Sequence, residues 1–270
     1  MVAGKGNSTC YPSSSLQISD LHRLIFVHVA KAGGSTIERS PIFDDRIQAQ
    51  KLAGLPLGIG GHEPVSIYAR DKGCAEYQIF AMVRNPCSRM VSLWAYYSQH
   101  RGNMGDIAFT NKYFGGDALR DVSTFVHHTA MKNSSWDWRA HQHFQTQTGM
   151  IAYHNRSGVD LLLALERWEE SLRALAALRP QLNDTLLSLS SNHVLASQHG
   201  TCAKSFSAGA WEVMTRMYAI DYCVLGYSSR ASEEGMVPQL ADLRPTEVTA
   251  RLQACCARLA PHHDCPNHKG

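Results

Sequence analysis

The chain has 270 residues, of which 44% are hydrophobic, and this is enough apolar material to bury one large core. Its formal net charge of +3 is too small to indicate general binding to nucleic acids, so we expect no nucleic-acid partner. No apolar run of roughly 18 residues is present, so we expect no membrane-spanning helix in this sequence and no membrane contact by the chain itself. These properties favour a single globular domain.

The first part of the chain combines a polar lead-in with a strand, a glycine turn and a helix. Residues 1–20 are rich in Gly, Ser, Asn, Pro and Thr, which predicts a flexible lead-in. An apolar run from Leu24 then leads into the loop Lys31-Ala32-Gly33-Gly34-Ser35-Thr36 and an expected helix. Free backbone N–H groups and the positive end of a helix dipole meet at such a turn, which suits an anion. Because the lysine precedes the glycines, this is not a Walker A motif. The pattern indicates a phosphate-binding α/β protein other than a common ATPase.

The next expected strand covers residues 77–83 and ends at Arg84. Ligands of open α/β sheets bind at the carboxyl ends of the strands, which places Arg84 at such an edge. Pro86 suits the first turn of a following helix, and Ser92 on that helix can lie near the same edge. A guanidinium fork and a hydroxyl both suit a phosphate, so this unit predicts a second phosphate contact.

Together the two segments resemble the nucleotide motifs of sulfotransferases that use 3′-phosphoadenosine 5′-phosphosulfate (PAPS), particularly the Golgi carbohydrate branch with the heparan sulfate 2-O-sulfotransferases and chondroitin sulfotransferases. The chain departs from the family pattern at Ala30 for proline, Ala32 for threonine and Asn85 for aspartate. The resemblance implies a P-loop-like sulfotransferase fold, in which a central parallel sheet is flanked by helices. It also implies the residues that bind the nucleotide, which are Lys31, Ala32, Gly33, Gly34, Ser35 and Thr36 for the 5′-phosphosulfate and Arg84 and Ser92 for the 3′-phosphate.

Weaker similarities continue along the chain. Residues 160–170 resemble the strand of the family that ends in a glutamate, here Glu166, and is followed by a helix. Residues 210–227 resemble its terminal helix with a Tyr-x-x-Asp signature, formed here by Tyr218 and Asp221. The resemblance implies a catalytic domain at 21–228. Residues 229–270 are expected to form a linker and an amphipathic helix, near 245–260, that packs on or trails the domain.

The resemblance also implies the reaction, which is transfer of a sulfuryl group from PAPS to an acceptor hydroxyl by in-line attack. The expected acceptor is a carbohydrate, and a small hydroxyl-bearing molecule is the alternative. Lys31 is the catalytic residue expected on the leaving-group side, and no metal is required. His62 follows Gly60 and Gly61 in a segment similar to the Gly-His segment of the 2-O-sulfotransferase branch, and is the expected catalytic base. That branch has a second histidine two residues earlier, where this chain has Gly60. We expect His28, inside an apolar strand, to be a satisfied core histidine.

Two other functions compete with this interpretation. A P-loop-like kinase of a small molecule would use ATP and magnesium, but the Walker lysine and an evident magnesium-binding carboxylate are missing. An inactive glycan-binding module on the same fold is the other alternative, against which Lys31, Arg84 and His62 together argue. Residues 136–145, with two tryptophans, an arginine, His141 and His143, form either a glycan-binding surface or a buried aromatic turn. The two histidines lack a third metal ligand at a diagnostic spacing.

Cysteines and glycosylation sequons indicate the cellular compartment. Eight cysteines permit up to four disulfides of undetermined connectivity, with a buried free thiol as the alternative at Cys87. Four N-glycosylation sequons start at Asn7, Asn133, Asn155 and Asn183. Both signals favour the Golgi lumen or the secretory pathway, with an N-terminal anchor absent from this sequence, and a soluble cytosolic protein is the alternative. The Cys- and His-containing tail matches no zinc-finger spacing, which favours disulfides or a mobile tail. The identity of the acceptor and the oligomeric state stay open at this stage.

Overall fold

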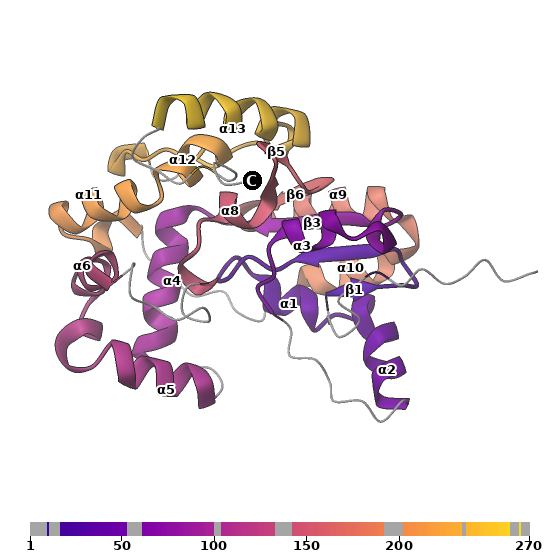
Figure 1. Cartoon of the computed structure of the whole chain (residues 1–270), viewed down its shortest axis with the longest axis horizontal. Coiled ribbons are helices and arrows are strands. Elements are labelled where there is room, and N and C mark those ends of the chain that lie inside the picture. Colours follow the sequence, from indigo (N-terminus) through magenta and orange to yellow (C-terminus); the bar gives the residue numbers. More distant parts are fainter. Residues whose placement is uncertain are drawn as a thin grey trace, which may run out of the picture.

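A four-stranded sheet with the order β1-β2-β3-β6 forms the centre of the computed structural model (Figure 1). The structure describes residues 10, 17–52, 61–99, 104–132, 142–191, 202–233, 236–259 and 265. The strands of the sheet are β1 Ile18–Ser19, β2 Leu24–Val27, β3 Gln78–Val83 and β6 Leu161–Ala164. β2, β3 and β6 are parallel, which confirms the predicted sheet, whereas β1 pairs antiparallel with β2 at one edge.

Both faces of the sheet are covered, which explains why its strands are continuous apolar runs. Side chains of a strand alternate between the faces, so Leu24 and Phe26 enter one core while Ile25 and Val27 enter the other. The helices, shown in Figure 1, are α1 Gly34–Glu38, α2 Asp44–Leu52, α3 Val65–Arg70, α4 Pro86–Ser98, α5 Met104–Tyr113, α6 Val122–Lys132, α8 Gln147–Ile151, α9 Trp168–Leu178, α10 Asn183–Ser191, α11 Ala208–Met217, α12 Ala219–Leu225 and α13 Pro245–Leu259.

The two cores have different sizes. The smaller core packs β2, β3 and β6 against residues of α1, α9 and α10. The larger core includes residues of α3, α4, α6, α8, α11, α12 and α13 on the opposite face. Among the described residues, every helix is either too short or too polar to span a bilayer. A short antiparallel hairpin, β4 Ala152–Tyr153 and β5 Arg156–Ser157, lies outside the main sheet.

Local sequence signals account for the helix that follows β3. The side chain of Asn85 accepts a hydrogen bond from the N–H of Cys87 at 2.9 Å and caps α4, while Pro86 occupies the first turn. The helix expected at 210–227 is divided in two at Tyr218, which has φ −112° and ψ 24° and ends α11 before α12 begins.

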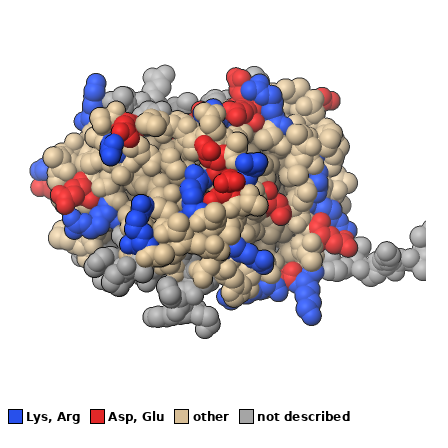
Figure 2. Space-filling view, turned by 90° about the horizontal axis from the view of Figure 1, so that it is seen from above, with Lys and Arg blue, Asp and Glu red and all other residues tan. Residues whose placement is uncertain are grey.

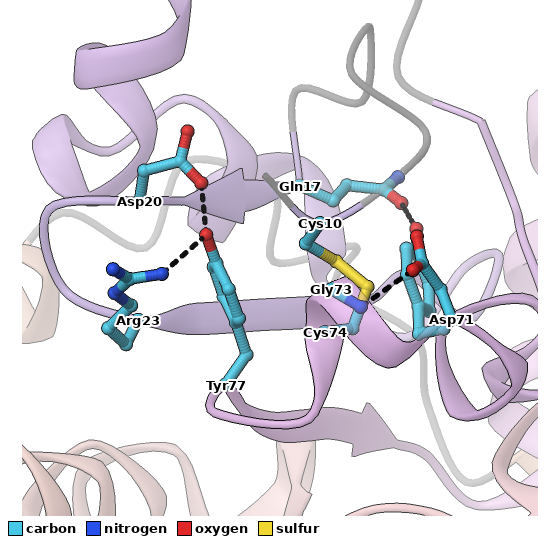
Figure 3. Close-up of a disulfide and its surroundings, with 9 residues drawn as sticks. Cys10, Gln17, Asp20, Arg23, Asp71, Gly73, Cys74 and Tyr77 are labelled. Carbon is cyan, nitrogen blue, oxygen red and sulfur yellow. Dashed lines mark hydrogen bonds between the residues drawn. A yellow bond between two sulfur atoms is a disulfide. The ribbon is translucent and has the colours of Figure 1, made fainter. Parts of the chain in front are cut away.

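The N-terminal segment is part of the fold (Figure 3). Cys10 forms a disulfide with Cys74, and the side chain of Gln17 is fully buried. The hydroxyl of Tyr77 donates to Asp20 and accepts from Arg23 Nη1 at 3.2 Å. The flexible lead-in expected at residues 1–20 is therefore corrected for the described part of that range, because a disulfide, an edge strand and buried polar contacts fix it.

Disulfides also fix the C-terminal segment. Cys223 on α12 pairs with Cys255 on α13, and Cys256 pairs with Cys265. The helix predicted near 245–260 is thus α13, and it packs against α12 and β5. The 3₁₀ helix η8, Leu240–Leu243, contacts the edge strand β6, so the expected linker packs on the domain. Seen from above, this face carries basic and acidic side chains interspersed, as the small net charge suggests (Figure 2).

The fourth disulfide joins Cys87 to Cys202, so the alternative of a free thiol at Cys87 is wrong. Cys87 lies in the first turn of α4, and Cys202 begins the 3₁₀ helix η6, Cys202–Ser205. The two cysteines are 115 residues apart in the sequence. The bond therefore ties the helix that follows Arg84 to a distant segment of the chain.

Candidate functional site

A cavity of about 350 Å³ opens where β2, β3 and β6 end. Its position agrees with the rule that ligands of parallel sheets bind at the carboxyl ends of the strands. Of the residues expected from the sequence, Ala32 alone does not line it, because its side chain is fully buried in the larger core. The lining residues are His28, Lys31, Gly33, Gly34, Ser35, Thr36, His62, Arg84, Ser88, Ser92, Tyr96, His143, Leu165, Glu166 and Trp168.

The glycine loop has the geometry of an anion cradle. Gly33 has φ +84° and caps α1, a conformation that favours glycine. A Cβ atom at Gly34 would overlap the ring of His28, so the loop lies directly against that ring. The N–H groups of Ala32 and Thr36 bond to the carbonyls of Val29 and Gly33 within the loop. The amides of Gly34 and Ser35, at the start of α1, are therefore the best-placed backbone donors for an anion.

The ammonium group of Lys31 is held over an aromatic ring in the cavity. Its Nζ atom lies 4.1 Å from the ring centroid of Tyr96, a distance typical of a cation–π contact. The hydroxyl of Tyr96 donates to Asp106 at 2.7 Å. Burial and that bond raise the pKa of Tyr96, so the ring stays neutral beneath the lysine. This arrangement presents one positive charge beside the glycine loop.

Arg84 follows β3 and is fixed through its backbone. Gln147, at the start of α8, accepts from the N–H of Arg84 at 2.9 Å and donates to its carbonyl at 2.7 Å. The guanidinium Nη1 donates to the carbonyl of Lys31 at 3.3 Å, which links the two nucleotide motifs directly. Burial lowers the pKa of Arg84, and the nearby Glu166 opposes this effect.

Glu166, just after β6, binds one earlier and one later part of the chain. One carboxylate oxygen accepts from the N–H of Asn85 at 2.7 Å. The other accepts from the hydroxyl of Tyr227 at 2.8 Å, and burial raises the pKa of that tyrosine. The two family-like segments, 160–170 and 210–227, are therefore joined by the hydrogen bond between Tyr227 and Glu166, beside Arg84.

His62 is oriented by a backbone carbonyl. Its Nδ1 lies 2.8 Å from the carbonyl oxygen of His28, and a carbonyl can only accept, so Nδ1 carries the proton. Burial, together with the nearby His28 and His143, lowers the pKa of His62 well below its usual range. The neutral ring then has its lone pair on Nε2. This is the form that a general base requires.

His28 is buried and satisfied, as expected, but it also lines the cavity. Its Nδ1 contacts the carboxylate of Glu38 at 2.8 Å, and its ring lies 4.4 Å from that of His62. Burial alone would raise the pKa of Glu38, but hydrogen bonds from His28 and Gln17 outweigh it and lower the pKa. An ionised carboxylate thus lies directly behind the histidine.

Sequence reasoning assigned no role in the cavity to several of its residues. Ser88 and Ser92 are four residues apart on α4, a spacing that places both on one helix face and could have revealed Ser88. His143 has no comparable signal, because only the fold brings it to the cavity. Of the segment 136–145, residues 136–141 lie outside the described part. In its described end, Phe144 is buried and His143 lines the cavity.

The fold and the site define an α/β protein whose strand ends bring two phosphate-type motifs and three histidines around one cavity. The sequence pattern that describes the Sulfotransferase family matches residues 14–228. The chain therefore belongs to the sulfotransferase family. No curated protein and no solved structure matches it significantly.

Proposed function

We propose that this protein transfers the sulfuryl group of PAPS to a hydroxyl of a carbohydrate, with His62 as the general base. Sulfotransferases in general use PAPS as the donor. One observation carries the proposal, namely that a single cavity combines the glycine loop, Lys31 and Arg84 with the base-competent form of His62. Two cationic side chains and a loop that has no Cβ atom at Gly34 fit a nucleotide that carries phosphate groups at both the 3′ and the 5′ position of its ribose.

In this mechanism the hydroxyl oxygen of the acceptor forms a bond to sulfur while the bond between sulfur and the 5′-phosphate oxygen breaks. The hydroxyl proton passes to Nε2 of His62, and the electron pair of the broken bond stays on the departing phosphate. Lys31 and the amides of Gly34 and Ser35 stabilise the charge that develops there. Arg84 holds the 3′-phosphate and thereby orients the donor.

The proposed acceptor and compartment have their own support. Tyr96 lines the cavity and offers aromatic surface of the kind on which sugar rings stack. Four disulfides are typical of an oxidising compartment, which supports the Golgi lumen or the secretory pathway. Asn155 and Asn183 are exposed, so both can accept a glycan. Intact mass of the protein from a secretory host tests this point, because unmodified asparagines and free thiols would contradict it.

The donor site is tested by calorimetric titration with adenosine 3′,5′-bisphosphate, beside ATP with magnesium. We expect binding of the bisphosphate and a loss of about 10- to 100-fold in Arg84→Ala, because a charged hydrogen-bond donor is removed. Arg173→Ala, which removes an exposed arginine of α9, is the matched control. Preference for ATP with magnesium would favour the kinase.

Transfer itself is tested with ³⁵S-labelled PAPS and desulfated heparan sulfate, desulfated chondroitin or a desialylated glycoprotein. We expect label on at least one acceptor and a loss of transfer in His62→Ala with bisphosphate binding unchanged. Bisphosphate binding without any transfer would instead favour an inactive glycan-binding module.

A further inference from the structure

A third histidine, besides His28 and His62, faces the cavity from a segment that buried groups hold in place. His143 precedes α8, and its ring lies 4.9 Å from that of His62. Nη2 of Arg89 donates to the carbonyls of His143 at 3.0 Å and Gln145 at 2.8 Å. Between them, the carbonyl of Phe144 accepts from the hydroxyl of Tyr218 at 3.1 Å. Three consecutive carbonyls therefore have buried donors, and the backbone position of His143 is fixed.

The residues that follow are fixed in the same way. The carboxylate of Asp221 accepts from the N–H groups of Gln147 at 2.9 Å and Thr148 at 2.8 Å. Burial raises the pKa of Asp221, while the charge of Arg89 opposes that rise. The Tyr-x-x-Asp signature of Tyr218 and Asp221 thus serves to hold the segment from which His143 enters the cavity.

The side chain of His143 is oriented as well. The hydroxyl of Tyr97, a residue only 1% exposed, lies 2.6 Å from Nδ1. A phenol donates readily to a neutral imidazole nitrogen, and the proton of the ring then resides on Nε2. Burial lowers the pKa of His143 to about 4, so the ring is neutral near pH 7. Because Nδ1 is occupied by Tyr97, Nε2 is the nitrogen that can reach a bound group.

The two neighbouring rings are therefore complementary. His62 donates through Nδ1 to a carbonyl and keeps its lone pair on Nε2. His143 accepts through Nδ1 and keeps its proton on Nε2. One ring can take a proton from the cavity, and the other can offer a hydrogen bond to it. Lys31 lines the same cavity as these two rings.

We propose that His143 is a second catalytic histidine, which donates a hydrogen bond from Nε2 to a sulfuryl oxygen during transfer, with Tyr97 as its positioning residue. This inference rests on the proposed sulfuryl transfer. His143 keeps its proton throughout, while the acceptor proton passes to His62 and the leaving phosphate keeps the electron pair. The donor stabilises the charge on the sulfuryl oxygens in the transition state.

Transfer kinetics separate a donor from a base. With ³⁵S-labelled PAPS and whichever of the three acceptors wild type sulfates, His143→Ala should lower kcat about 100- to 1,000-fold, the usual effect of losing such a donor. Bisphosphate affinity should stay within about twofold, since the contact forms in the transition state. His143→Gln keeps an N–H donor and should retain more activity. His127→Gln, on the exposed surface of α6, is the control. Wild-type kcat in His143→Ala, or equal losses in both His143 variants, would overturn the inference.

A second measurement is independent of turnover. Nitrogen-15 NMR of the histidine rings in the full chain, with and without adenosine 3′,5′-bisphosphate, distinguishes the two neutral tautomers. We expect His143 to be protonated on Nε2 at pH 7, and Tyr97→Phe to weaken that preference. A proton on Nδ1, or a charged ring at pH 7, would overturn the assignment. If wild type transfers no sulfate to any acceptor, the proposed function fails, and the NMR result still decides whether His143 presents a donor.

Discussion

Arg89 should be the most sensitive single position for both stability and nucleotide binding. Arg89 is 2% exposed, and its guanidinium donates to the carbonyl of Ala30, just before the glycine loop, at 2.9 Å. It also donates to the carbonyls of His143 and Gln145. One side chain therefore connects the start of the loop proposed to bind the phosphosulfate with the segment that carries His143.

The cost of changing Arg89 follows from those three bonds. A buried carbonyl left without a donor costs about 1–3 kcal/mol. In Arg89→Lys a single ammonium keeps the charge and can serve the carbonyls of His143 and Gln145, which share Nη2, but the fork is lost and the carbonyl of Ala30 loses its donor. The free energy of unfolding should then fall by about 1–3 kcal/mol, a sizeable share of the stability of a typical domain. The bisphosphate should also bind more weakly, because the start of the glycine loop loses its contact at Ala30.

Urea unfolding followed by circular dichroism measures this effect as a shift of the midpoint at unchanged slope. Arg216→Lys is the control, because Arg216 is exposed and forms an exposed ion pair with Glu212, so the loss should stay within about 0.5 kcal/mol. If Arg89→Lys lost no more stability than the control, the three carbonyl bonds could not have the role described above.

Three further predictions concern other parts of the site. Gly34→Ala should weaken bisphosphate binding in calorimetry at least about tenfold by displacing the His28 ring, whereas Gly115→Ala, where a Cβ would make an ordinary contact with the carbonyl oxygen of Asn111 at 3.8 Å, should not. The pKa of His143 is about 4 in the folded protein and about 6.5 in the unfolded chain, so between these pH values only the unfolded chain binds the proton. The free energy of unfolding should therefore fall by up to about 3 kcal/mol as pH decreases through this range. A His143→Gln variant should show a shallower dependence in urea unfolding. Cys202→Ser should lower stability by about 2–5 kcal/mol in the same assay, and an unchanged midpoint would show that its bond to Cys87 is dispensable.

The sequence predicted the parts of the site that lie within one strand–turn–helix unit. The glycine loop and Arg84 are local patterns, because each side chain is placed by the strand just before it. His62 was found through similarity of its segment, and the structure adds its partner, the carbonyl of His28. Predicting these residues required only the order of residues along the chain and the rule that parallel strands end at one edge of the sheet.

The remaining parts depend on contacts between distant segments. His143 reaches the cavity only because Arg89 and Tyr218 bind its neighbouring carbonyls, and no spacing in the sequence records that. The pairing of Cys10 with Cys74 likewise could not be chosen among the possible connectivities. The edge strand β1 has two residues, too few to give an alternating pattern.

Both borders of the central sheet offer little strand for pairing. At one border the edge strand β1 has only two residues, and at the other η8 lies against β6, where the carbonyl of Pro238 also accepts from Arg167 at 2.8 Å. A long bare strand offers unpaired backbone groups to any other chain, and a short edge strand and a covered edge both limit that route to self-association. A protein that must stay dispersed in a crowded compartment gains from this, since its parallel strands form slowly and are exposed while they do. Progressive deletion of residues from either end of the chain would therefore be expected to cause aggregation before the deletion removed residues of the cavity.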